Sequence, residues 1–147
     1  MSSESKLSGV RVDQISVTHE DSRRAMTEII SSPNITLRDI KLLEIHQPNS
    51  GSEFVVGGHW EQGLEVQYIV TGSMARLDVA DVESGDEKSF QNLPTGTRIY
   101  LPPGIAHMMT FTEAATLFVL NEVPYTPAKL VVYLPWKERH ADAQSKA

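Results

Sequence analysis

The sequence contains no cysteine. A chain without cysteine forms no disulfide framework, holds no thiolate-bound zinc or iron–sulfur cluster, and has no cysteine nucleophile. Basic residues are in the minority, since 13 Lys and Arg stand against 19 Asp and Glu and leave a formal net charge of −6. An acidic surface repels phosphate backbones and anionic lipid headgroups, so neither nucleic acid nor a membrane is expected as a partner.

Long hydrophobic runs are missing as well. No stretch approaches the ~20 apolar residues that a membrane-spanning helix needs, and residues 1–9 lack the basic start and apolar segment of a secretory signal. The sequence therefore predicts a soluble, cytoplasmic protein. With 147 residues, of which 40% are hydrophobic, the chain has the length and composition of a single packed domain.

The interior of the chain consists of short apolar runs separated by turn residues such as Pro94-Thr95-Gly96. A turn signal about every 8–12 residues is typical of all-β sandwiches and barrels. The expected strands are Val10–Val17, Leu37–Gln47, Phe54–Trp60, Glu65–Thr71, Ala75–Asp81, Lys88–Leu93, Thr97–Leu101, Ala106–Phe111, Ala115–Asn121 and Lys129–Leu134.

We expect residues 10–135 to form one barrel, with a flexible tail at 1–9 and a polar tail at 136–147. A short helix from Trp136 to about Ala143 is compatible with the second tail. Between Asp21 and Ile30 the apolar residues fit one face of a helix, but the same residues also fit a strand. Both alternatives stay open for that segment.

Polar residues that could take part in catalysis or bind a metal gather in two places. In an extended strand, alternate side chains share a face, so His59 and Glu61 point the same way. A turn after Glu61 would return Glu65 beside them, and the turn before His107 would place this second imidazole at the start of another strand. Two imidazoles and two carboxylates suit Zn, Fe, Mn, Ni or Co better than a thiophilic ion.

The spacing of these residues resembles the two motifs of the cupin superfamily. The positions that match are His59, Glu61, Glu65 and Gly72 in the first motif, and Gly96, Pro102, Gly104 and His107 in the second. Glu61 stands where the first motif has its second His, and Phe111 where the second motif ends in Asn. The resemblance implies an all-β, single-domain jelly-roll barrel (a double-stranded β-helix of the RmlC-like type) with little helix. It also implies a divalent metal bound by His59, Glu61, Glu65 and His107.

A narrower resemblance points to the sugar-nucleotide epimerases and ketoisomerases among the cupins. The stretch Leu101–His107 is similar to their Ile-Pro-Pro-Gly-x-Ala-His, and the segments Ser22–Glu28 and Asn121–Pro127 resemble two further segments of that group. The Arg that precedes the His pair in those enzymes is absent from this chain. The resemblance implies proton transfer on a keto-sugar linked to a nucleoside diphosphate.

Within the predicted site, several roles stay open. His59 and Glu61 are the candidate catalytic residues, and Glu61 is either a metal ligand or a general base. The two histidines with the two glutamates form either a metal site or a metal-free polar pocket. Gln67, Arg76 and Tyr100 flank the motifs on neighbouring strands and are candidates for substrate binding.

Three functions from different classes fit this sequence. The first is an enzyme of the epimerase or isomerase type, acting on a polar carbonyl compound that is small or linked to a nucleotide. The second is a metal-dependent oxygenase or lyase, and the third is a non-catalytic cupin that binds a small molecule. The apolar segment Lys129–Leu134 predicts a homodimer, because exposed apolar strands recruit partners.

Overall fold

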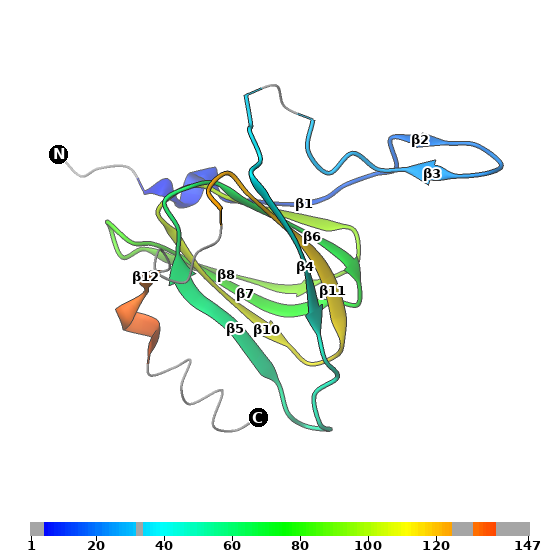
Figure 1. The fold of residues 1–147 in the computed structure, drawn as a ribbon. Coiled ribbons are helices and arrows are strands. Elements are labelled where there is room, and N and C mark those ends of the chain that lie inside the picture. Colours follow the sequence, from blue (N-terminus) through cyan, green and yellow to red (C-terminus); the bar gives the residue numbers. More distant parts are fainter. Residues whose placement is uncertain (1–4, 32–33, 125–130, 138–147) are drawn as a thin grey trace.

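The computed structural model describes residues 5–31, 34–124 and 131–137 and consists mainly of two five-stranded sheets that face each other (Figure 1). The first sheet has the strand order β1 (Arg11–Gln14), β9 (Thr97–Leu101), β6 (Glu65–Thr71), β11 (Ala115–Asn121) and β4 (Asp39–Ile45). The second has the order β12 (Val131–Val132), β5 (Phe54–Trp60), β10 (Ile105–Phe111), β7 (Met74–Asp81) and β8 (Glu87–Leu93).

The chain crosses repeatedly from one sheet to the other. It passes from β5 in the second sheet to β6 in the first and back to β7, and later runs through β9, β10 and β11 in the same alternating way. All paired strands in the two sheets are antiparallel. This is the expected all-β jelly-roll barrel.

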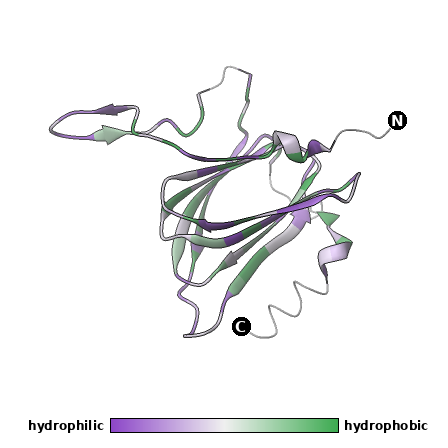
Figure 2. Ribbon diagram, turned by 180° about the vertical axis from the view of Figure 1, so that it is seen from behind, coloured by the Kyte–Doolittle hydropathy of each residue, from purple (hydrophilic) through white to green (hydrophobic). Residues whose placement is uncertain are grey.

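The main core lies between the sheets, because successive side chains of a strand point to opposite faces and one face of each sheet turns inward. Figure 2 shows hydrophobic residues on the strands of both sheets. The buried cluster between the sheets includes Ile69, Ile99 and Leu117 from the first sheet and Leu77, Met109 and Phe111 from the second.

Most strands lie where the turn residues place them, and differences concentrate at the chain ends. The strand expected at Val10–Val17 is shorter, and residues 6–9 form the 3₁₀ helix η1 (Lys6–Gly9) instead of continuing the tail. The side chain of Ser5 accepts a hydrogen bond from the Leu7 N–H at the start of this helix, and Asp81 accepts one from the Lys6 N–H at 2.8 Å. The second contact ties η1 to the end of β7.

Within the segment Asp21 to Ile30, for which two structures were possible, Ala25–Met26 forms a strand. β2 (His19–Glu20) pairs with β3 (Ala25–Met26) in a short hairpin, which extends away from the barrel in both views (Figures 1 and 2). Asp21 accepts hydrogen bonds from the backbone N–H groups of Arg23 and Arg24, which stabilise the turn of the hairpin.

The last described segment covers the outer face of the second sheet. β12 pairs with β5, and the 3₁₀ helix η3 (Leu134–Trp136) follows it. Tyr133 and Trp136 are buried there against a cluster that includes Val55 and Met108. The helix considered for Trp136 to Ala143 extends outside the described residues. No helix in the described part of the chain is long and apolar enough to cross a membrane.

Candidate functional site

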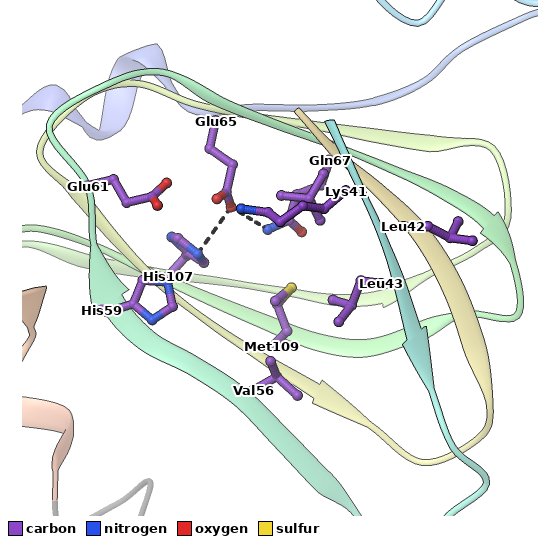
Figure 3. A pocket seen from close by; sticks show the side chains of 11 residues that line it. Lys41, Leu42, Leu43, Val56, His59, Glu61, Glu65, Gln67, His107 and Met109 are labelled. Atoms are coloured by element: carbon purple, nitrogen blue, oxygen red, sulfur yellow. Dashed lines mark hydrogen bonds and ion pairs between the residues drawn. The ribbon is translucent and has the colours of Figure 1, made fainter. Parts of the chain in front are cut away.

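A cavity of about 440 Å³ lies between the two sheets. Side chains from β4, β5, β6, β10 and β11 line it, so both sheets contribute. The lining residues are Lys41, Leu42, Leu43, Val56, His59, Glu61, Glu65, Gln67, His107, Met109 and Val119 (Figure 3). The four residues predicted as the core of the site are therefore brought together in one pocket.

The two histidines face each other because of an irregularity in the strand pairing. β5 and β10 pair with His59 opposite His107, and the register shifts directly after His107. Gly57 lies at this shift with φ +101°, where an added Cβ would lie 2.7 Å from the carbonyl oxygen of His107. Only glycine allows the two backbones to approach this closely. The imidazole rings meet edge to face, with their centroids 4.9 Å apart.

Glu65 is a fully buried carboxylate held by three donors. Its Oε2 lies 3.1 Å from His107 Nε2 and 2.7 Å from Gln67 Nε2, and its Oε1 lies 3.0 Å from Asn121 Nδ2. Burial alone would raise the pKa of Glu65, but the charge of His107 and the hydrogen bonds from Asn121 and Gln67 lower it to about 2. The site thus contains a permanent negative charge that is neutralised by its immediate neighbours.

Glu61 behaves in the opposite way. Its Oε2 accepts a hydrogen bond of 2.8 Å from Asn121 Nδ2, the same amide that donates to Glu65. Burial and then the nearby charge of Glu65 raise the pKa of Glu61 to about 7. Two neighbouring carboxyl groups with pKa values pushed apart are a common arrangement in acid–base sites. Glu61 can hold or release a proton near neutral pH.

The arrangement of donors does not fit a metal ion bound by all four residues. Among the described residues, no group of three or more His, Asp or Glu side chains is placed to hold a metal. His107 Nε2 is directed at Glu65 Oε2, which also accepts from Gln67, so the atoms that would bind an ion bind one another. The geometry favours the metal-free polar pocket, and metal binding stays a prediction.

The residues predicted to bind substrate divide into two groups. Gln67 lines the pocket, and in the described part of the chain its Oε1 is buried without a hydrogen-bond partner. Arg76 instead lies on β7 beside Asp78, whose Oδ1 is 2.8 Å from Arg76 Nη2. Tyr100 packs against the cluster of Leu64, Val66 and Leu120 outside the first sheet. The guanidinium carbon of Arg11 lies 4.4 Å from the centroid of its ring. Arg76 and Tyr100 therefore do not line this pocket.

Sequence reasoning missed Lys41 and Asn121. Lys41 lies beside Val119 in the pairing of β4 with β11, and Asp39 lies beside Asn121. Burial alternates along β4, and Lys41, Leu43 and Ile45 share its less exposed face. The sequence does not show this, because Ile40 and Leu42 on the other face are apolar yet exposed. Nothing local indicates that β4 pairs with β11 next to the two glutamates.

Comparisons with known proteins support the fold. No protein-family profile and no curated protein sequence matches the chain. Solved structures do match. The RmlC epimerase from Mycobacterium tuberculosis is 20% identical with a TM-score of 0.67, and the match covers 86% of this chain and 70% of that one. ChmJ, a 3'-monoepimerase from Streptomyces bikiniensis in complex with dTDP-quinovose, is 19% identical with a TM-score of 0.66, covering 83% and 68%.

A third structure has a chain of similar length. It is a variant of the 3,4-ketoisomerase QdtA from Thermoanaerobacterium thermosaccharolyticum in complex with TDP-4-keto-6-deoxyglucose, with 16% identity, a TM-score of 0.65, and coverage of 93% of this chain and 95% of that one. At these identities the likeness concerns the fold. The sequence resemblance is confirmed at that level: the chain has the RmlC-like cupin fold.

Proposed function

We propose that this protein catalyses proton transfer at a carbon atom next to a carbonyl group, as an epimerase or isomerase does. The observation that carries the proposal is the pair His59 and Glu61 in one pocket, with the pKa of Glu61 raised to about 7. A general acid or base is most effective when its pKa lies near the working pH. Figure 3 shows both side chains at the polar end of the pocket.

The proposed roles follow from burial and hydrogen bonding. His59 is partly exposed to the pocket and removes the proton, while the electron pair of the broken C–H bond moves to the carbonyl oxygen and forms an enolate. Protonated Glu61 returns a proton to the same carbon from another direction. Where that carbon carries a hydroxyl group, the proton can instead go to the former carbonyl carbon, while the hydroxyl proton moves to the enolate oxygen and the hydroxyl becomes the new carbonyl group. His107 and Glu65 lie behind His59 and position its ring through the edge-to-face contact.

The comparisons support the reaction class. The neighbours are named as a 3'-monoepimerase, an RmlC epimerase and a 3,4-ketoisomerase, and one of them was solved with TDP-4-keto-6-deoxyglucose. A nucleotide-linked keto-sugar is accordingly one of the substrates to test. No described contact favours the oxygenase or lyase alternative over proton transfer.

Solvent exchange measures the proposed step directly. The protein is incubated in D₂O with TDP-4-keto-6-deoxyglucose and with small free keto compounds, and NMR follows deuterium at the carbons next to the carbonyl. We expect incorporation with wild type, a loss of at least about a hundredfold with His59→Asn, and no loss with His46→Asn, which removes an exposed histidine at the end of β4. Equal exchange by wild type and His59→Asn would contradict the assigned role of His59.

A further inference from the structure

The charges around the pocket are unevenly distributed. Lys41 is the one Lys or Arg among the described residues that line the cavity, while two glutamates line it as well. Its side chain is 35% exposed and its Nζ lies 3.5 Å from Asp39 Oδ2. Lys41 is also near enough to Glu61 for its charge to oppose the rise in the pKa of that carboxyl. The ammonium group therefore lies at the polar end, on the side of β4.

The other part of the pocket is apolar. Leu43, Val56, Met109 and Val119 come from four different strands and line the same cavity. Figure 3 shows Leu43, Val56 and Met109 gathered at one end, away from Glu61 and Glu65. Val119 is next to Lys41 in the strand pairing, so the cation lies where the polar and apolar parts meet. A ligand that fills the pocket must present a hydrocarbon body to this end.

A nucleoside diphosphate matches this lining poorly. Proteins bind diphosphates through Arg forks, backbone N–H groups of glycine-rich loops, or helix N-termini, and stack the base on aromatic rings. None of the described lining residues is Arg, Phe, Tyr or Trp. The lining offers a partner for a single negative charge.

We propose that the pocket takes a small carbonyl compound with an apolar body and one negative charge, such as a 2-oxo carboxylate, and that Lys41 binds that charge. The inference rests on the proposed proton transfer, for which it names the substrate class. In such a complex the carbonyl and its neighbouring carbon face His59 and Glu61, and the hydrocarbon part lies against Leu43 and Met109.

Calorimetry with three probes tests the substrate class. α-Ketoisocaproate has the predicted charge and body, its methyl ester has the same body without the charge, and dTDP has the diphosphate. Lys41→Met keeps the side-chain length and removes the charge, Lys41→Arg restores a charge, and Lys88→Met removes an exposed lysine that lies over Phe90 on β8. All variants are compared with wild type at one ionic strength.

The expected result is binding of α-ketoisocaproate that Lys41→Met weakens about tenfold or more, as expected for loss of a charge-assisted contact. The affinity for the methyl ester should differ by less than about twofold between Lys41→Met and wild type. Lys41→Arg should recover most of the affinity for the acid, and Lys88→Met should bind the acid as wild type does. Tighter binding of dTDP than of the keto acid, equal weakening of acid and ester, or no binding of the acid at millimolar concentration would overturn the proposal.

The two proposals fail in different ways. If α-ketoisocaproate binds in a Lys41-dependent manner but exchanges no deuterium in the presence of the protein, the proposed binding of the keto acid stands. The proposal that the protein catalyses proton transfer on this compound is then wrong. If TDP-4-keto-6-deoxyglucose exchanges deuterium while α-ketoisocaproate does not bind, proton transfer stands and the inferred substrate class is wrong.

Discussion

At the scale of single residues, the site depends on how one amide and one imidazole distribute charge between two carboxyl groups. Asn121 donates to both Glu61 and Glu65, and His107 pairs with Glu65 alone. The negative charge is thereby fixed on the more deeply buried group, and the proton is left on the more accessible one. In the proposed reaction Glu61, which stands where the cupin motif has its second histidine, is the second proton-transfer group.

Glu61→Gln should change how stability depends on pH. The pKa of Glu61 is about 7 in the folded protein against an ordinary value of 4.5, so between these values the folded state keeps a proton that the unfolded chain has released. The contribution of Glu61 to the free energy of unfolding is therefore fully present below about pH 4.5 and is lost as the pH rises to about 7. Because Glu61 is only partly buried, we expect a difference on the order of 1 kcal/mol.

Urea denaturation of wild type and Glu61→Gln across this pH range measures the effect. The stability of wild type should fall relative to the variant as pH rises. Glu44→Gln removes an exposed carboxylate from β4 and serves as the control. If the wild-type and Glu61→Gln curves run parallel, Glu61 does not hold a proton in the folded state at neutral pH.

Gly57→Ala should destabilise the protein by about 2–4 kcal/mol, because strain at positive φ adds to a collision with backbone. The added Cβ would lie 2.7 Å from the carbonyl oxygen of His107 at φ +101°. Gly85 is a matched control, since it has φ +79° with no atom within 4 Å of an added Cβ. Gly85→Ala should cost only about 1 kcal/mol. Equal losses in thermal unfolding would show that the approach of β5 to β10 does not depend on Gly57.

At the scale of elements, strand positions followed from turn residues, but the faces of the strands did not. Phe54–Trp60, Glu65–Thr71, Thr97–Leu101 and Ala115–Asn121 have the bounds that the sequence predicts. Arg76 and Tyr100 alternate correctly within their strands yet lie outside the barrel, because alternation fixes which residues share a face and not which face is inside. The segment after Asp21 became a hairpin through backbone pairing that periodicity could not distinguish from a helix.

The C-terminal segment should support the strand that carries His59. β12 pairs with β5 at Trp60 and His59, and the N–H of Tyr133 donates to the carbonyl of Gly58 at 2.9 Å. Trp136 is fully buried and anchors this segment. Trp136→Ala should cost about 3–5 kcal/mol in urea denaturation and shift the NMR signals of the His59 ring. The nearby control Leu134→Ala, at a side chain 71% exposed, should change stability by less than about 0.5 kcal/mol.

If Trp136→Ala unfolds the protein at the temperature of measurement, Trp136→Phe keeps most of the packing and tests the same link. Unchanged His59 signals in a folded variant with reduced stability would show that the segment stabilises the barrel without positioning the site.

At the scale of the whole molecule, the cavity depends on pairings between strands far apart in the sequence. Glu61, Glu65 and His107 could be predicted as one site because the resemblance supplied their spacing. Lys41 and Asn121 could not, since Lys41 reaches the pocket through the pairing of β4 with β11, and Asn121 lies beside Glu65 through the pairing of β11 with β6. Local patterns give the elements of a barrel, while the lining of its interior depends on which distant strands become neighbours.

The homodimer stays a prediction, and the molecule has a surface suited to it. In the described part of Lys129–Leu134, the edge strand β12 exposes Val131 and Val132 by 41% and 55%. An apolar edge strand is open to pairing with a second chain. Light scattering at tens of micromolar should give twice the 16.3 kDa chain mass, and Val132→Glu should lower it. A wild-type mass of 16.3 kDa would contradict the prediction.

Our proposal is that side chains of this pocket, without a metal, exchange protons with a carbonyl compound. Its most direct test is deuterium incorporation in D₂O by protein dialysed against a strong chelator and verified as metal-free by elemental analysis, with TDP-4-keto-6-deoxyglucose and α-ketoisocaproate as candidate substrates. We predict that at least one of them gains deuterium next to its carbonyl group at a rate that chelation leaves unchanged. Exchange that disappears with the metal and returns when Zn²⁺, Fe²⁺, Mn²⁺, Ni²⁺ or Co²⁺ is added back would contradict the account, as would no exchange into either compound.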